Sequence, residues 1–326
     1  MKEKIITKKI LKWYDLNKRP LPWRKKVSVE KKQYYTLISE FMLQQTQVIT
    51  VIPFFNRFIK NLPSINSLAK VSEKKLIKLW EGLGYYSRAR NLKKSAQVIL
   101  KNFDGKLPDN FEDLITLPGI GNYTANAILA IAFNKPYIPL DGNIERVLKR
   151  YLYLKKDKEI QKDYLLQKKI VFGKTLRSSD YAQALMELGA LICKPNNPIC
   201  AQCPIIKNCK SYKKKDFSLI KNIKKNKDKY FVLKVYKKDQ RYLLIKNTKF
   251  NFLKNLTIFP MEELSNPKNF NKNLNFKMSN MNMNIKIEYS NDNKKFPYSY
   301  WVDGTKMNSY MLPSFTKKIV QYLEKN

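Results

Sequence analysis

Apolar positions in the first two thirds of the chain recur at spacings of three and four residues, the period of an amphipathic helix. The expected helical stretches are residues 34–59, 73–79, 89–100, 111–117 and 124–133, and the first residues read as a further amphipathic helix. These stretches are punctuated by Pro53, Pro63, Pro108, Pro118, Pro136 and Pro139. Short helices joined by short loops indicate one compact, mainly α unit.

The hydrophobic period changes near residue 230. Residues 213–229 hold eight Lys and two Asp, which indicates a solvated basic linker. Residues 230–236 and 241–246 are rich in β-branched and aromatic side chains and are expected to form paired strands. Residues 266–293 contain ten Asn among 28 residues and are expected to be loops, before a short closing helix at 314–323. The last third is therefore expected to be a small α+β domain.

Charge and residue usage narrow the chemistry. The 326 residues include 64 Lys plus Arg and 26 Asp plus Glu, a net charge of +38. That excess favours a polyanionic partner, nucleic acid first and an acidic membrane surface second. Heavy use of Lys, Asn and Ile also fits a genome rich in A·T base pairs, which would account for part of the excess. The chain has no His, so acid–base chemistry near neutral pH falls to carboxylates, Tyr, Lys or Cys.

No apolar run approaches the roughly 20 residues of a membrane span, and no continuous apolar segment marks a secretory signal. We therefore expect a cytoplasmic protein without a membrane partner. The cysteines are clustered rather than scattered, which favours a metal site in a reducing compartment over a disulfide framework. They are Cys193, Cys200, Cys203 and Cys209.

Four thiolates without His leave two choices for that site, structural zinc or a 4Fe–4S cluster. Zinc ribbons pair their ligands as two Cys-x-x-Cys units, and only Cys200 and Cys203 have that spacing.

Two glycines stand in the turn Leu-Pro-Gly-Ile-Gly at residues 117–121, between two helical patterns. Gly119 and Gly121 allow close approach of a ligand to the backbone, and the helix expected from Asn122 offers free N–H groups to a phosphate. This pattern is typical of a helix–hairpin–helix DNA-binding element, although alone it also fits an ordinary turn between helices. Asp141 follows about twenty residues later, either as the cap of a helix over 144–151 or as a carboxylate facing a cleft.

Together with residues 21–24, 39–48 and 82–91, the hairpin and the cysteine loop resemble MutY-type adenine DNA glycosylases of the endonuclease III superfamily. The similarity covers about residues 10–212. It implies a helix–hairpin–helix glycosylase domain over 1–212, made of a six-helix barrel and a 4Fe–4S subdomain. It also implies base excision repair by a monomer that acts on adenine opposite 8-oxoguanine or guanine in double-stranded DNA.

The resemblance implies a role for each of four cleft residues. Glu40 corresponds to the general acid that protonates the flipped adenine, and its apolar neighbours are expected to raise its pKa. Asp141 corresponds to the carboxylate that stabilises the oxocarbenium-like sugar, and Asn143 to a hydrogen-bonding residue of the same site. Tyr123 stands where bifunctional relatives carry a nucleophilic Lys, so a monofunctional enzyme is expected.

Further positions correspond to DNA-binding and pocket residues. Gln44, Gln45 and Tyr85 would fill the space left by the extruded base, with Tyr85 as the wedge, although Tyr85 also fits ordinary packing. The expected lining of the adenine pocket is Arg19, Trp23, Arg24 and Glu187, of which Arg24 and Glu187 also fit a structural ion pair.

The last third, residues 230–326, resembles the family's Nudix-like, 8-oxoguanine-reading domain only loosely. Ser299 corresponds to the serine of a Phe-Ser-His loop in which Tyr300 replaces the His. No Nudix hydrolase signature is present, so nucleotide hydrolysis is not expected.

Two other functions remain open from the residues. An endonuclease III-like pyrimidine glycosylase with lyase activity is disfavoured by Tyr123, by the Gln44–Gln45 pair and by the extra domain. A catalytically idle, cluster-bearing DNA-binding protein is disfavoured by the presence of both Glu40 and Asp141.

Overall fold

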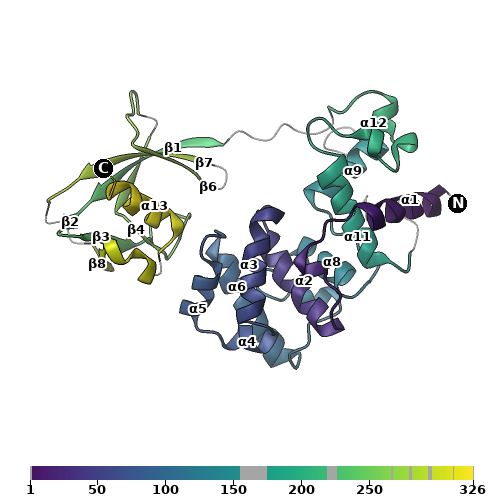
Figure 1. The fold of residues 1–326 in the computed structure, drawn as a ribbon, viewed down its shortest axis with the longest axis horizontal. Coiled ribbons are helices and arrows are strands. Elements are labelled where there is room, and N and C mark those ends of the chain that lie inside the picture. The colour runs from purple at the N-terminus through teal and green to yellow at the C-terminus, as the bar shows by residue number, and fades with distance from the viewer. Residues whose placement is uncertain are drawn as a thin grey trace. The chain divides into compact units, whose positions relative to one another are not determined.

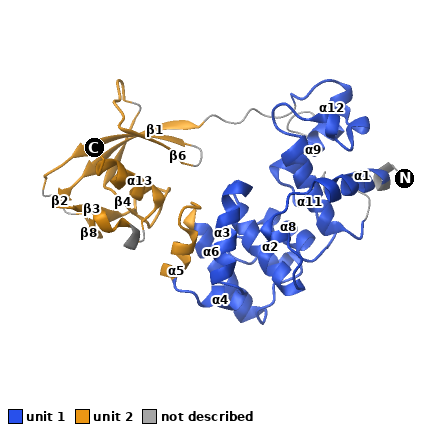
Figure 2. Cartoon of the chain, viewed as in Figure 1, with its two compact units in different colours: residues 1–72, 87–222 blue, residues 73–86, 223–326 orange. Residues whose placement is uncertain are grey.

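The computed structural model describes residues 2–154, 175–218, 226–265, 267–278, 281–292, 296–310 and 312–325. These residues form two compact units (Figure 2). Unit 1 contains residues 1–72 and 87–222, and unit 2 contains residues 73–86 and 223–326. Residues 219–225 of the expected linker lie outside the described part. No helix in the described ranges is both long and apolar enough to cross a membrane.

Unit 1 is helical, as the periodicity predicts (Figure 1). Several of its helices begin at a polar cap that accepts a backbone N–H of the first turn, as Ser28 does for α2 and Asn110 for α7. Its helices are α1 Lys2–Asn17, α2 Val29–Leu43, α3 Val48–Asn61, α4 Ile65–Lys70, α6 Tyr86–Asn102, α7 Phe111–Leu114, α8 Asn122–Ile131, α9 Gly142–Leu152, α11 Ser178–Glu187 and α12 Lys210–Lys213.

The helix α8 is largely enclosed within unit 1. Six of its ten residues are buried, and it packs against α2 and α11. A second apolar cluster joins α1, α9 and α11 through side chains such as Ile10, Ile144 and Leu185. Because α11 packs against α1, α8 and α9, it connects the two packed regions of unit 1.

One expected helical stretch in unit 1 is broken. Residues 34–59 form α2 and α3, which are separated by a turn at residues 44–47, and Pro53 lies inside α3 rather than at a boundary. Gln45 in that turn has φ +57°, a left-handed conformation that ends the helix. Apolar spacing alone did not reveal the break, because apolar residues resume at Val48 directly after the turn.

Unit 2 holds α5 Glu73–Trp80 and an α+β fold, which confirms the expected class of the C-terminal region. One sheet has the strand order β5-β1-β7-β6, formed by Met261–Leu264, Lys227–Val235, Met281–Tyr289 and Leu274–Met278. It is mixed, because β1 and β7 are parallel while its other pairs are antiparallel.

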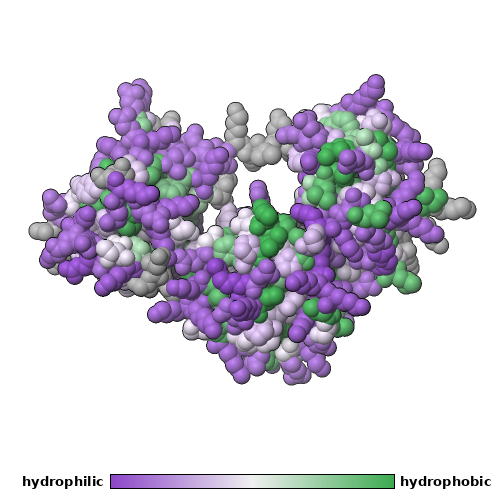
Figure 3. Space-filling model, in the orientation of Figure 1, coloured by the Kyte–Doolittle hydropathy of each residue, from purple (hydrophilic) through white to green (hydrophobic). Residues whose placement is uncertain are grey.

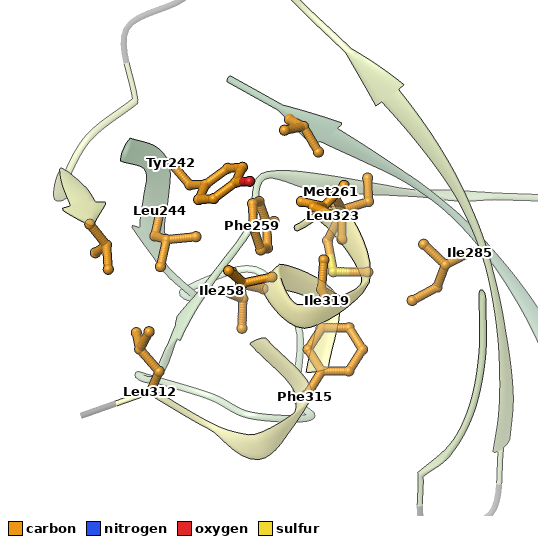
Figure 4. Close-up of a cluster of buried hydrophobic side chains, with 14 of the residues drawn as sticks. Tyr242, Leu244, Ile258, Phe259, Met261, Ile285, Leu312, Phe315, Ile319 and Leu323 are labelled. Carbon is orange, nitrogen blue, oxygen red and sulfur yellow. The ribbon is translucent and has the colours of Figure 1, made fainter. Parts of the chain in front are cut away.

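In the second sheet, β3 (Arg241–Lys246) pairs with β2, β4 and β8, which are Lys237–Lys238, Thr257–Ile258 and Ser299–Asp303. The short 3-10 segment η5 (Gly304–Ser309) follows β8. The closing helix α13 spans Ser314–Leu323, as predicted. Figure 4 shows Phe315, Ile319 and Leu323 of α13 facing Ile285 and Met261 across the core of unit 2.

Two expectations for this region are wrong. The stretches 230–236 and 241–246 do not form a strand pair, although Leu243 N donates to Tyr236 O at 3.1 Å. The strands β1 and β3 belong to different sheets, and the two-residue β2 forms the hairpin with β3. Residues 266–293 contain the strands β6 and β7 rather than loops alone. There Asn alternates with apolar residues, so Phe276 and Ile285 face the core while Asn275 and Asn284 hydrogen-bond on the other face (3.1 Å).

Candidate active site

A cleft of about 1680 Å³ opens in unit 1 between α2, α8, α9 and α11. Ten of the residues singled out in the sequence line it, although they come from positions as far apart as 19 and 187. They are Arg19, Trp23, Arg24, Glu40, Gln44, Gln45, Tyr123, Asp141, Asn143 and Glu187. The fold therefore brings the two expected carboxylates and the expected pocket residues to one concave surface.

Glu40 lies in the last turns of α2 and is 5% exposed. Burial raises the pKa of its carboxyl from 4.5 to about 7, because the ionised form loses its hydration. The Tyr123 hydroxyl opposes this shift by donating a hydrogen bond to the carboxylate, whereas the charge of Asp141 adds to it. Glu40 can thus carry a proton near neutral pH, as the sequence predicts for a group with apolar neighbours.

Asp141 caps α9. Its Oδ1 accepts the backbone N–H of Ile144 at 2.7 Å, and its Oδ2 accepts the Asn143 side-chain amide at 2.9 Å. Burial raises the pKa of Asp141, while these hydrogen bonds and the nearby Arg146 act in the opposite direction. The two interpretations of Asp141, helix cap and cleft carboxylate, are therefore both true of the same side chain.

Arg146 was not singled out in the sequence, yet it joins the cleft to the cysteine loop. Its Nη2 donates to Asn143 Oδ1 at 2.7 Å, and its Nε donates to the backbone oxygen of Cys193 at 2.7 Å. Arg146 follows Asn143 by three residues on α9, so the two side chains share one helical face. That spacing is the signal from which the contact could have been predicted.

Glu187 is fully buried and forms ion pairs with two arginines at the cleft wall. Arg19 Nε lies 2.8 Å from one carboxylate oxygen, and Arg24 Nη2 lies 2.9 Å from the other. Arg24 Nε also donates to Gln183 Oε1 at 2.7 Å, which adds a cleft residue that sequence reasoning missed. Arg24 and Glu187 therefore form the ion pair that the sequence offered as an alternative, and both side chains also line the cleft.

Trp23 packs edge-on against Phe55, with ring centroids 5.3 Å apart. Its ring therefore has one fixed neighbour in α3 while it also lines the cleft.

The hairpin at residues 117–121 is closed by a hydrogen bond from Ile120 N to Leu117 O at 3.1 Å. Gly119 has φ +83°, and a Cβ there would lie 2.9 Å from both Asn91 Cβ and Phe41 Cε1, so only glycine fits. The next helix, α8, begins at Asn122 as predicted, and no side chain caps it. Its first N–H groups are thus available to an anion.

The three expected helix-filling residues differ in conformation. The Gln44 side chain donates to the backbone oxygen of Gly119 at 3.3 Å and to Thr124 Oγ1 at 3.4 Å, so it supports the hairpin. Gln45 is exposed with φ +57°, and Tyr85 is 40% exposed with φ +46°. Left-handed backbone at two non-glycine residues is strained and is commonly found at functional sites.

The four cysteines surround one small, mainly apolar cavity beside α9. Arg150 lies next to it at 2% exposure, with Nη1 3.5 Å from Cys193 Sγ and hydrogen bonds to the backbone oxygens of Lys194 and Pro195. Burial raises the pKa of the Cys203 thiol to about 12. Within the described residues, no three Cys, Asp or Glu side chains are grouped closely enough to hold a single metal ion.

Ser299 belongs to unit 2, at the start of β8, and its hydroxyl donates to the backbone oxygen of Phe296 at 2.9 Å. The neighbouring Tyr300 hydroxyl is hydrogen-bonded to Thr257 Oγ1. Tyr298 has φ +56° and is 74% exposed, and Trp301 is 41% exposed. Ser299 thus stands in a short aromatic surface segment, residues 298–301.

Comparison with known proteins places the chain. Residues 38–170 match the HhH-GPD superfamily of base excision DNA repair proteins. An adenine DNA glycosylase of Buchnera aphidicola subsp. Schizaphis graminum is 40% identical over 266 residues, which cover 78% of this chain and 74% of that protein. An adenine DNA glycosylase of Homo sapiens is 39% identical over 211 residues, covering 62% and 38% respectively.

Solved structures agree at the level of the fold. A thermostable thymine-DNA glycosylase aligns with a TM-score of 0.57 and 28% identity, covering 65% of this chain and 97% of that one. An endonuclease III–DNA complex aligns with a TM-score of 0.53 at 22% identity, also over 65% of this chain. The matched family region contains α8, its hairpin and the residues Glu40 and Asp141. The chain belongs to the adenine DNA glycosylase family, within the helix–hairpin–helix superfamily of base excision repair proteins.

Proposed function

We propose that the chain hydrolyses the N-glycosidic bond of adenine opposite 8-oxoguanine or guanine in double-stranded DNA and leaves an abasic site. The observation that carries this proposal is the carboxyl of Glu40, whose pKa is about 7 in the cleft that also contains Asp141. A carboxylic acid that keeps its proton near neutral pH beside a second carboxylate is the arrangement that glycoside-cleaving enzymes use.

The steps follow from the positions of the two carboxyls. Glu40 gives its proton to a ring nitrogen of the extruded adenine, which makes the base a neutral leaving group. Asp141 stabilises the positive charge that develops on the sugar, and its hydrogen bonds from Ile144 N and Asn143 hold it in place. Water then adds to the anomeric carbon of the sugar, and the proton it loses returns to the Glu40 carboxylate, which restores the acid.

Tyr123 supports a monofunctional reaction. Burial raises its pKa well above 10, and its hydroxyl is hydrogen-bonded to Glu40, so it stays protonated and orients the acid. A phenol cannot form the Schiff base with the abasic sugar that strand cleavage by a lyase requires. We therefore expect the strand to remain intact after base removal.

DNA as the partner agrees with the family and with the charge of the chain. The net charge is +38, and the face drawn in Figure 3 is largely hydrophilic. The hairpin around Gly119 and the N-terminus of α8 would hold a backbone phosphate, since no side chain caps the first N–H groups of α8. Binding should consequently weaken steeply as salt rises.

A 4Fe–4S cluster held by Cys193, Cys200, Cys203 and Cys209 is part of the proposal. The donor set is four sulfurs with no His, and all four cysteines line one shared cavity, which fits a cluster held by four thiolates. When bound, the cluster would cross-link the loop and supply the positive charge that the thiolates need. The buried Arg150 adds a further cation against that loop.

Unit 2 is proposed to read the base opposite adenine. Residues 230–326 would form the Nudix-like recognition domain, and the Ser299 hydroxyl oxygen would accept a hydrogen bond from 8-oxoguanine at the exposed segment 298–301. The Tyr300 hydroxyl is held by Thr257, so Ser299 and the exposed Tyr298 and Trp301 are left as the contacts of this segment.

A single-turnover assay tests the reaction. Duplexes carry adenine opposite 8-oxoguanine, guanine or thymine, and each sample is divided before treatment with alkali. Strand breaks that appear only after alkali, with the first two duplexes, are the expected result. Breaks without alkali would contradict the monofunctional assignment, and no breaks from protein that binds the duplex would contradict glycosylase activity.

The cofactor is tested separately. Purified protein is assayed for iron, acid-labile sulfide and visible absorbance, beside the variant Cys203→Ala. Equal amounts of iron and sulfide in the parent, with loss of both in the variant, are expected. Zinc in place of iron would contradict the cluster assignment without affecting the proposed reaction.

A further inference from the structure

One face of α6 contacts two other elements of unit 1, the C-terminal end of α2 and the hairpin at residues 117–121. Arg88, Asn91 and Ser95 are spaced by three and four residues, so their side chains lie on the same side of the helix. Arg88 and Asn91 lie in the stretch 82–91 that carries the family resemblance, but the sequence analysis assigned no role to any of the three. None of them lines the cleft.

Arg88 holds the C-terminal end of α2. It is 7% exposed, and its Nη1 donates to the backbone oxygens of Phe41 at 3.1 Å, Met42 at 2.8 Å and Gln44. Its Nη2 donates to Thr46 Oγ1 at 3.1 Å. The last carbonyls of a helix have no partner within the helix and carry its negative pole, so a buried guanidinium satisfies them both in hydrogen bonding and in charge.

Asn91 and Ser95 support the hairpin from the same face. The Asn91 side chain lies against Gly119, where an added Cβ would come within 2.9 Å of it. Ser95 is fully buried, and its hydroxyl donates to the backbone oxygen of Pro118 at 2.6 Å. The side chain of Gln44, which begins the turn that Arg88 holds, donates to Gly119 O and completes the connection.

The turn at residues 44–47 needs such support. Gln45 adopts φ +57° there, a conformation that costs free energy for a residue with a side chain and persists only when its surroundings impose it. Arg88 contacts the backbone on one side of Gln45, at Gln44 O, and the side chain on the other, at Thr46 Oγ1. Loss of the guanidinium would therefore release the exposed Gln45 from this conformation.

We propose that Arg88 is a positioning residue for base extrusion: by clamping the α2–α3 turn it holds Gln45 ready to enter the duplex. This inference rests on the proposed glycosylase function. It assigns to Arg88 a part in the step that separates adenine from its partner and none in bond cleavage itself.

The test compares two substrates. One duplex carries adenine opposite guanine, where the pair must be broken, and the other carries adenine opposite a stable abasic analogue, where no pair exists. Single-turnover rates are measured for the parent, Arg88→Lys and Arg88→Met, and 2-aminopurine in place of adenine reports unstacking by fluorescence. Lys94→Met is the matched control, because it removes an exposed cation from the same helix.

We expect Arg88→Met to lower the rate on the paired adenine by about 10- to 100-fold, the size of effect that a misplaced supporting group produces. The rate on the unpaired adenine should fall by less than about threefold, since the bond-breaking groups are intact. Arg88→Lys should be intermediate, because one ammonium cannot span the carbonyls and Thr46 as a planar guanidinium does. The fluorescence change should shrink in parallel.

Equal losses on the two substrates would show that Arg88 only stabilises the fold, and no loss on either would show that the clamp is dispensable; each result overturns the proposal. If Arg88→Met does not fold, Thr46→Val removes one partner of the clamp with little change in volume and should show the same substrate difference, to a smaller extent. A parent protein that releases adenine from neither duplex would instead contradict the glycosylase function.

Discussion

The two units bury their polar groups in different ways. Among the described residues, all four buried charged side chains, Glu40, Arg88, Arg150 and Glu187, belong to unit 1. Buried polar side chains of unit 2 are neutral, such as Asn247, Asn284 and Thr316. A buried charge is costly unless it is paired, so its presence marks a place where the fold was selected for more than stability. The chemistry of the chain is therefore concentrated in unit 1.

Removing the acid should give the largest difference. Glu40→Gln keeps the shape of the side chain but lacks the transferable proton, so the single-turnover rate should fall by about 10²–10⁴-fold while duplex affinity is retained. Gel-shift titrations beside rate measurements check both parts. Unchanged turnover would remove Glu40 from its assigned role.

The pH dependence gives an independent reading of the same residue. The acid acts in its protonated form, so the rate should decline as pH rises through about 7, the pKa of Glu40. The folded pKa lies above the unfolded value, so the folded state binds the proton more tightly and stability is lost as pH rises from about 4.5 to about 7. Relative to the parent, Glu40→Gln should consequently become more stable with rising pH, as measured by thermal melting.

Breaking the buried ion pair of unit 1 should cost more than breaking an exposed pair of unit 2. Glu187→Gln leaves Arg19 and Arg24 at the cleft wall without a carboxylate, and we expect a loss of about 3 kcal/mol in the free energy of unfolding. Glu263→Gln removes the partner of Lys229 at the surface and should cost less than about 1 kcal/mol. Comparable losses in urea titrations would contradict the contrast between the units.

Arg150, whose guanidinium lies beside the cysteines, allows a second comparison of a buried side chain in unit 1 with an exposed one in unit 2. Arg150→Met leaves the carbonyls of Lys194 and Pro195 without their donor, which should cost about 2 kcal/mol. Arg241→Met changes an arginine that is 52% exposed in unit 2 and should have an effect within about 0.5 kcal/mol. Iron content of the Arg150 variant should fall on heating before that of the parent.

The smallest effect is expected in unit 2. Ser299→Ala should reduce the preference for adenine opposite 8-oxoguanine over adenine opposite guanine by about fivefold, the worth of one neutral hydrogen bond. The two rates are measured under identical single-turnover conditions. An unchanged ratio would remove Ser299 from the recognition surface and direct attention to Tyr298 and Trp301.

The sequence predicted the local structure of unit 1 better than the strand arrangement of unit 2. In unit 1, local patterns carried much of the information: the glycines of the hairpin, the N-terminus of α8 at Asn122 and the cap at Asp141 are all where the residues indicate. In unit 2, the Asn-rich composition concealed the alternation of β6 and β7, and the strands 230–236 and 241–246 were assigned to one pair although they lie in two sheets. Strand pairing joins distant residues, so no local pattern specifies it.

The sequence by itself determined the helical character of the first two thirds, the hairpin, the four-cysteine loop and the two carboxylates, because each depends on residue types at short spacing. Only the tertiary structure decided which side chains contact one another. These contacts are the hydrogen bond from Tyr123 to Glu40, the ion pairs of Arg19 and Arg24 with Glu187, the hydrogen bonds of Arg146 to Asn143 and Cys193, and those of Arg88 to the end of α2. A charged group is tolerated in the interior only where its partners converge, and convergence of residues far apart in the chain is a property of packing.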